Sequence, residues 1–255
     1  MPWRGVFVVC ALFGVGIALW SLRMPETLPA AERQPLNVRQ VGIAARVIAT
    51  NRVSLYYTIA LMAMFGVFSS YLASSERIVG DVFHHRPLFP LVFGGAAVMM
   101  GLASLITGRS VERIGLERMI SGVLATYALA SVVLVVLARS SSGVPSFVPY
   151  IVVLTVVIAA QQVLSSTMSA AAMVPTGHIV GTAAALFAMS SIAAGAIVGA
   201  IIDQRYDGTV TPFSTAQVIA AAVVVVLALA ARRVNREPRS TDAGGRPDGA
   251  RLPVP

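Results

Sequence analysis

The residues best suited to chemistry in this sequence are amide and hydroxyl side chains inside a long apolar run. Gln161 and Gln162 are followed by Ser165, Ser166 and Ser169. At helical spacing, Gln161 shares a face with Ser165. Gln162 shares a second face with Ser166 and Ser169. Polar side chains inside a membrane turn away from lipid, toward a neighbouring helix or water. Such a face therefore either lines a cavity for a small molecule or only hydrogen-bonds to another helix.

A second group of candidate residues lies in the charged stretch 108–118, which separates two apolar runs. Its charged residues are Arg109, Glu112, Arg113, Glu117 and Arg118. Gly108 would let a helix end approach a neighbour closely, and Gly115 tolerates a tight turn. A carboxylate such as Glu112 beside an arginine would cap or pair with a neighbouring helix terminus, for roughly 0.3–1 kcal/mol. A generic solvated turn is the simpler interpretation.

The usual motifs of enzymes and metal sites are absent from the sequence. It has no Gly-x-Ser-x-Gly, no phosphate loop and no cluster of metal ligands. His84 and His85 are adjacent, so their side chains diverge, and no carboxylate stands at a ligand spacing. The single cysteine, Cys10, excludes an internal disulfide. We expect no enzyme activity, no metal and no cofactor.

Composition identifies the class of protein. The chain of 255 residues is 56% hydrophobic and only 12% charged, whereas about a quarter of a soluble domain is charged. We therefore predict an integral membrane protein. All 19 basic residues are arginine, which indicates a GC-rich genome and favours a bacterial source. The net charge of +8 does not indicate nucleic-acid binding, because the arginines lie in loops and the tail.

Seven apolar runs are long enough to cross about 30 Å of hydrocarbon, at roughly 20 residues per span. They are 5–22, 53–75, 88–107, 119–138, 147–172, 179–202 and 214–231. The sequence thus predicts an all-α, polytopic transmembrane helix bundle. Its parts are a first transmembrane helix (1–22), a cytoplasmic basic linker (23–52), a six-helix bundle (53–231) and a disordered cytoplasmic tail (232–255). The alternative for the first run is a signal peptide, with a cleavage site at Leu28-Pro29-Ala30.

Arginine counts predict how the chain is threaded. Five arginines lie in the 23–52 connection, three in the 109–118 turn and six after Ala231. Five lie on the other side: Arg4, Arg77, Arg86, Arg139 and Arg205. Because positive loops are retained inside, we expect a multi-pass protein of the bacterial inner membrane with its N-terminus outside and its C-terminus cytoplasmic. In the linker, Val41 to Ala49 would form a short helix on the anionic leaflet.

Three further patterns concern helix packing and titration. Phe65, Phe68 and Tyr71 lie on one helical stripe, which either lines a path for flat apolar cargo or only packs. Small residues in two runs indicate close helix contacts: Gly94, Gly95 and Gly101 in the third, and Gly195 and Gly199 in the sixth. His178 would titrate near neutral pH and so carry a proton, with helix capping or simple surface exposure as the alternative.

Three stretches carry a resemblance to a known family. Residues 108–118 read Gly-x-x-x-(Asp/Glu)-Arg-x-Gly-x-x-Arg and match at Gly108, Glu112, Arg113, Gly115 and Arg118. This pattern resembles the loop signature of the major facilitator superfamily. The helix end Arg23-Met-Pro-Glu-Thr-Leu28 resembles the end of the sixth helix in drug-resistance transporters of the Bcr/CflA type. The stretch from Met173 to Ala183 resembles the entry to their eleventh helix.

The resemblance implies a fold and a function. The chain would hold helices six to twelve, half of a major-facilitator fold plus one extra helix, and would serve in proton-coupled multidrug efflux as a truncated or partial form. Phe68, Tyr71, Gln161, Gln162 and Ser165 would line the cavity, and the 108–118 turn would gate it. Expected partners are the lipid bilayer, small amphipathic substrates, protons, and a missing N-terminal half or a second copy. The alternative is a non-transporting membrane protein, either a remnant or an assembly partner.

Overall fold

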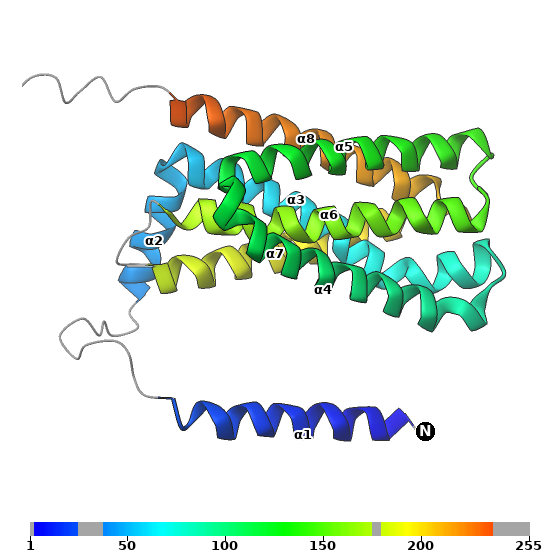
Figure 1. Ribbon diagram of the computed structural model, residues 1–255, viewed down its shortest axis with the longest axis horizontal. Coiled ribbons are helices and arrows are strands. Elements are labelled where there is room, and N and C mark those ends of the chain that lie inside the picture. Colours follow the sequence, from blue (N-terminus) through cyan, green and yellow to red (C-terminus); the bar gives the residue numbers. More distant parts are fainter. Residues whose placement is uncertain (1–2, 25–37, 175–179, 237–255) are drawn as a thin grey trace, which may run out of the picture. The chain divides into compact units, whose positions relative to one another are not determined.

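The computed structural model describes residues 3–24, 38–174 and 180–236 (Figure 1). All the regular elements in these ranges are helices, and seven of them are long and apolar enough to cross a membrane. This confirms the all-α, polytopic fold. The chain forms two compact units, Met1–Val38 and Arg39–Pro255.

The first unit contains α1 (Trp3–Ser21), which corresponds to the first predicted span. None of the side chains in its most apolar stretch is buried within the structure. Phe13 and Trp20, for example, are each 72% exposed. In water such a helix would leave a large apolar surface unburied, so its composition suits a lipid environment. The alternative cleavage site at residues 28–30 lies outside the described residues.

The second unit contains the remaining helices, which run up and down in sequence order (Figure 1). They are α2 (Val38–Thr50), α3 (Arg52–Arg77) with the π-helical extension η2 (Ile78–Val82), the 3-10 turn η3 (Arg86–Leu88), α4 (Phe89–Ile114), α5 (Leu116–Ser140), α6 (Phe147–Met173), α7 (Val180–Asp203) and α8 (Thr211–Arg236). The helix α8 continues through Arg236, so the first five residues of the predicted tail are helical; residues 237–255 lie outside the described ranges.

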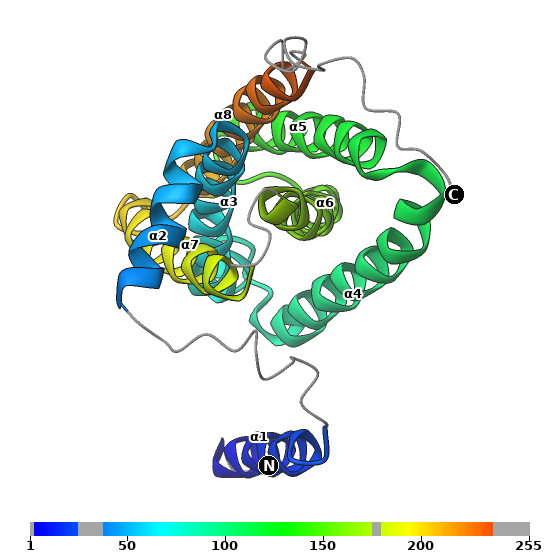
Figure 2. The same cartoon turned by 90° about the vertical axis from the view of Figure 1, so that its left-hand side faces the viewer.

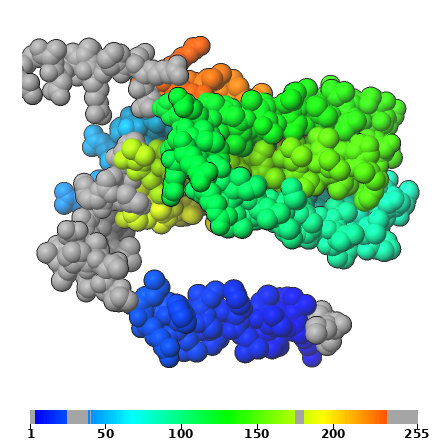
Figure 3. All heavy atoms as spheres, viewed as in Figure 1, coloured from blue at the N-terminus to red at the C-terminus, as the bar shows by residue number. Residues whose placement is uncertain are grey.

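Viewed end-on, α6 lies between α3, α4 and α5 (Figure 2). The core forms two clusters along the bundle, one around Met64 and Tyr127 and the other around Tyr71 and Tyr150. The helix α4 is peripheral and packs mainly against α6. Only 6% of its most apolar stretch is buried, and its side chains form part of the face seen in the space-filling view (Figure 3).

Glycines bring α3 and α7 together. A methyl group added to Gly66 would lie 2.6 Å from Cγ1 of Val198, and one added to Gly199 would lie 3.0 Å from Oγ of Ser69. A methyl group added to Gly195 would be at least as close to the Phe65 ring. The predicted close approach at Gly195 and Gly199 is thus confirmed, because only glycine leaves room for two backbones this near.

The glycines of α4 do not make the close helix contacts that the sequence predicted for them. No atom lies within 4 Å of a methyl group placed on Gly94, Gly95 or Gly101. The expectation that these small residues bring α4 close to a neighbour is therefore wrong within the described residues. The sequence pattern was similar, but α4 presents these positions to its exposed side.

The helix predicted at residues 41–49 is present and slightly longer, as α2. It starts the bundle and ends just before Asn51, whose side-chain oxygen caps α3 by accepting from the Ser54 backbone N–H at 3.0 Å. Ala44 and Ile48 are buried, while Arg46 is exposed. One face of α2 thus packs on the bundle, and its contact with anionic lipid stays a prediction.

Candidate functional site

Gln161 lies within a buried hydrogen-bond network in the second unit. Its side chain is 4% exposed, and its Nε2 donates to the backbone carbonyl of Met64 on α3 at 2.7 Å. Its Oε1 accepts from Nε2 of Gln217 on α8 at 3.3 Å. Nε2 of Gln217 also donates to the Tyr127 hydroxyl on α5 at 2.9 Å. The network therefore joins α3, α5, α6 and α8.

The sequence left two roles open for Gln161: lining a cavity or hydrogen-bonding to another helix. In this structure its side chain does the second. A buried amide without partners would cost free energy in apolar surroundings. The amide of Gln161 instead hydrogen-bonds to two neighbouring helices. Its direct contact with a transported molecule stays a prediction.

The neighbouring polar residues on α6 differ from Gln161. Gln162 and Ser165 are half-buried, and the described part of the chain gives neither side chain a hydrogen-bond partner. Their amide and hydroxyl groups are therefore available to a ligand or to water. Ser166 is exposed and donates to the backbone carbonyl of Val163 at 2.9 Å. Residues one or two positions apart on this helix thus have different hydrogen-bonding states.

The aromatic stripe continues from α3 onto α4. The ring centroids of Phe65 and Phe68 are 6.2 Å apart, and those of Phe68 and Tyr71 are 6.1 Å apart. The Tyr71 ring then stacks on Phe93 of α4, with centroids 5.8 Å apart and an interplanar angle of 10°. The predicted stripe is confirmed, and its exposure falls from 38% at Phe65 to 5% at Tyr71.

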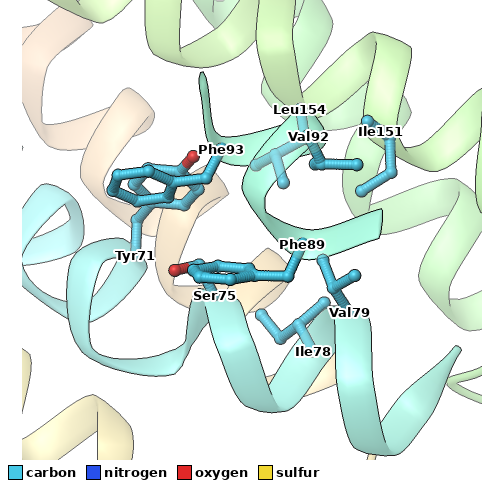
Figure 4. A pocket seen from close by; sticks show the side chains of 9 residues that line it. All are labelled: Tyr71, Ser75, Ile78, Val79, Phe89, Val92, Phe93, Ile151 and Leu154. Atoms are coloured by element: carbon cyan, nitrogen blue, oxygen red, sulfur yellow. The ribbon is translucent and has the colours of Figure 1, made fainter. Parts of the chain in front are cut away.

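Tyr71 and Phe93 belong to a small apolar pocket between α3, η2, α4 and α6 (Figure 4). Phe89 lies beside them, and Ile151 and Leu154 of α6 complete the lining. The free volume is about 10 Å³, which is room for roughly one water molecule. In this structure Tyr71 is therefore closed off from any molecule larger than water.

The charged stretch 108–118 is more helical than the sequence suggested. The helix α4 continues to Ile114 and α5 begins at Leu116, so Gly115 alone makes the turn. Gly115 has φ +83° and ψ 149°, a conformation that is almost restricted to glycine. Its predicted role in a tight turn is confirmed. Gly108 is exposed with open space around it, so its predicted close approach to a neighbour is wrong within the described residues.

The charged side chains of this turn lie on the surface of the bundle. Glu112, Arg113 and Arg118 are exposed. At the start of α5, the backbone carbonyl of Glu117 accepts a hydrogen bond of 2.9 Å from the Arg232 guanidinium on α8. The turn is thus tied to the end of the last helix, a contact that the sequence did not suggest.

Two other residues of the network were also missed from the sequence, namely Gln217 and Tyr127. Gln217 is a single amide in the last apolar run, and the rule that singled out Gln161 applies to it equally. Tyr127 gives no comparable signal, because a tyrosine in a membrane span is common at the interface as well as in the core. His178, a further candidate, lies outside the described residues.

Histidines and carboxylates do not gather into a metal site in the described ranges. His84 is exposed with φ +56°, and the His85 ring packs on Phe147 with centroids 4.7 Å apart. Asp81 forms an exposed ion pair with Arg86 at 2.9 Å.

Comparison with known proteins places this bundle in a family. The model of the Major Facilitator Superfamily matches residues 1–200. The chain belongs to the Major Facilitator Superfamily. Within this superfamily it is 27% identical over 212 residues to a bicyclomycin resistance protein homolog of Haemophilus influenzae, covering 82% of this chain and 52% of the relative. No solved structure matches the chain significantly.

A second major-facilitator relative is an uncharacterized MFS-type transporter, YdgK, of Bacillus subtilis. It is 26% identical over 204 residues, which cover 78% of this chain and 50% of the relative. The chain thus spans about half the length of the curated relatives that it matches. These findings confirm the family resemblance of residues 108–118 and agree with a transporter of the drug-resistance type. They identify a multi-pass membrane protein of a transporter family.

Proposed function

We propose that this chain serves in proton-coupled export of small amphipathic molecules, as a transporter without enzymatic activity. The observation that carries the proposal is the major-facilitator match over residues 1–200, together with the resistance protein among its relatives. By the arginine bias of its loops, we place it in a bacterial inner membrane with a cytoplasmic C-terminus.

The proposed cargo site is the set of residues on α3 and α6 singled out from the sequence. Gln162 and Ser165 support it best, because both are half-buried with unused hydrogen-bonding groups. Phe68 is half-buried beside Tyr71 and adds apolar contact. Gln161 would act indirectly, because its hydrogen bond to the Met64 carbonyl would hold α6 against α3. This combination suits flat, apolar molecules that carry one or two polar groups.

Movement of α4 would open the site. The helix α4 is the most exposed of the six helices α3 to α8 over its apolar stretch, and it meets α5 through the single residue Gly115. We propose that the 108–118 turn, with Gly108, Glu112, Arg113, Gly115 and Arg118, gates the cavity at this end. The contact of Arg232 with the start of α5 would hold α5 in place while α4 moves.

The proton-carrying group would belong to a second bundle. No Asp, Glu, Lys or Arg occurs in the six apolar runs that correspond to α3 to α8, namely 53–75, 88–107, 119–138, 147–172, 179–202 and 214–231. Asp203 lies at the end of α7, where it accepts a hydrogen bond of 2.6 Å from the Ser70 hydroxyl. We therefore propose that a further half-transporter, either an N-terminal half or a second copy, completes the cavity and supplies the protonation site.

A dye-efflux assay in bacterial cells tests export. If a second copy completes the cavity, cells expressing only this chain should accumulate less of an amphipathic dye than vector controls, and a protonophore should abolish the difference. Glu112→Ala should weaken export at equal expression. Glu76→Ala removes an exposed carboxylate near the C-terminal end of α3, away from the 108–118 turn, and should leave export unchanged. Unchanged export by Glu112→Ala would contradict the gating role.

The second candidate function is a membrane protein that assembles with another but does not transport. The hydrogen bonds of the buried Gln161 to α3 and α8 favour it, because they use this amide to hold helices together. In the same assay, dye accumulation equal to that of vector controls, with the chain present in the membrane, would support this second function over export by paired copies of the chain.

A further inference from the structure

A groove runs along the bundle between α7 and α8, and α3 forms its floor. Ala63 and Val67 line the floor, Ile202 lines one wall, and Ala216 and Ile219 line the other. The helices α7 and α8 make few contacts with each other. The space between them is about 540 Å³, within the range of roughly 300–1,000 Å³ that small-molecule sites occupy.

The length of the groove corresponds to one leaflet of a bilayer. It follows α8 from Thr211 to Val223, a distance of roughly 18 Å at about 1.5 Å per residue. Half of a hydrocarbon core about 30 Å thick is about 15 Å. The lining is almost entirely aliphatic or small, and Arg205 supplies the charge at the mouth, where α7 meets α8. The groove thus has the dimensions and polarity of a site for one acyl chain below a headgroup.

Arg205 is available to an anion at that mouth. Its side chain is exposed, and the described residues give it no hydrogen bond or ion pair. Asp203 is engaged by the Ser70 hydroxyl at 2.6 Å. Asp207 accepts hydrogen bonds from the Thr209 backbone N–H at 3.0 Å and from its hydroxyl at 2.7 Å. The two nearby carboxylates therefore bond to other groups, and the exposed Arg205 guanidinium has no partner among the described residues.

We propose that the groove between α7 and α8 binds one anionic phospholipid of the nearest leaflet, with an acyl chain along α3 and the phosphate on Arg205. Lipid tails are as apolar as the groove, so the acyl chain alone gives little preference over bulk lipid. The charge of Arg205 therefore decides between anionic and zwitterionic headgroups. This inference concerns a site separate from the proposed cargo residues and does not depend on transport.

Native mass spectrometry of the full chain in detergent tests the proposal. Phosphatidylglycerol and phosphatidylcholine with identical acyl chains are titrated separately, and the first bound lipid is counted. The wild-type chain should bind phosphatidylglycerol about fivefold more tightly, the effect of roughly one basic residue at a membrane surface. Arg205→Gln should reduce this preference to near equality. Arg139→Gln changes an exposed arginine on α5 at the same end of the bundle and should leave the preference intact.

A second variant tests the groove itself. Ile219 is 58% exposed on the groove wall, so Ile219→Trp narrows the groove without disturbing the core. It should weaken binding of both lipids while gel filtration stays unchanged. Three results would each overturn the proposal: equal affinity of the wild-type chain for the two lipids, an Arg205→Gln chain that keeps the preference, or an Ile219→Trp chain that binds phosphatidylglycerol as the wild type does.

Discussion

Gln217 on α8 donates a hydrogen bond of 3.3 Å to the side-chain oxygen of Gln161 on α6, inside the apolar core of the bundle. The two amides are 56 residues apart in the sequence and are 2% and 4% exposed. Each also bonds to a third or fourth helix, through Tyr127 and the Met64 carbonyl. Gln161, which the sequence offered as a cargo residue, thus hydrogen-bonds to neighbouring helices in this structure.

A double-mutant cycle measures this contact. Gln217→Leu and Gln161→Leu should each lower the free energy of unfolding in detergent, and their coupling should be about 0.6–1.7 kcal/mol, the range for hydrogen bonds between membrane helices. Gln162→Leu is the control, since the described residues give Gln162 no partner. Additive effects of the first two changes would show that the amides do not interact.

The contact between α3 and α7 should be intolerant of added volume. Gly66→Ala places a methyl group 2.6 Å from Cγ1 of Val198, whose branched side chain has little freedom to move. We expect a loss of about 1–3 kcal/mol in the free energy of unfolding, measured by thermal or denaturant unfolding. Gly101→Ala on α4 meets open space and should be neutral. Equal effects at the two sites would contradict the packing.

The turn between α4 and α5 should require glycine at one position and not at the other. Gly115→Ala forces a side chain into a conformation with φ +83° and should cost about 1–3 kcal/mol. Gly108→Ala changes a helical residue with open space around it and should be neutral or slightly stabilising. Unfolding in detergent compares the two, and a larger loss for Gly108→Ala would refute the assignment of the turn.

Removing each of two tyrosine hydroxyls should change the free energy of unfolding in opposite directions. The buried hydroxyl of Tyr206, in the connection between α7 and α8, has no hydrogen-bond partner among the described residues. Burial raises the pKa of Tyr206, and so do the nearby carboxylates Asp81 and Asp207, so the phenol stays neutral near pH 7. Tyr206→Phe should therefore raise the free energy of unfolding by about 1 kcal/mol, because it removes an unsatisfied polar group.

The matched substitution is Tyr150→Phe. The Tyr150 hydroxyl lies 3.2 Å from Oγ of Ser214 on α8, inside the core. Its loss should lower the free energy of unfolding by about 0.5–1.5 kcal/mol. Melting temperatures of the two variants, taken in the same detergent, should shift in opposite directions from the wild type. A loss of stability in Tyr206→Phe would mean that its hydroxyl has a partner.

The sequence alone determined the class of protein, the number of spans and the family. These properties depend on local composition: a span needs about 20 apolar residues wherever it packs, and the pattern between Gly108 and Arg118 lies within one short stretch. The boundaries were less exact at the charged ends of the helices, as at Ile114 and Arg236, because a helix continues past the hydrocarbon edge without any change in composition.

Only the tertiary structure decided which polar and small residues face each other. Gly199 and Gly101 look alike in the sequence, yet one meets Ser69 and the other meets open space. Gln161 and Gln162 are neighbours, yet the first is bonded to two other helices and the second keeps its amide free of protein partners in the described chain. The reason is that an apolar helix surrounded by lipid has no polar face to orient it. Its rotation about its own axis is therefore set by contacts with helices that are far away in the sequence.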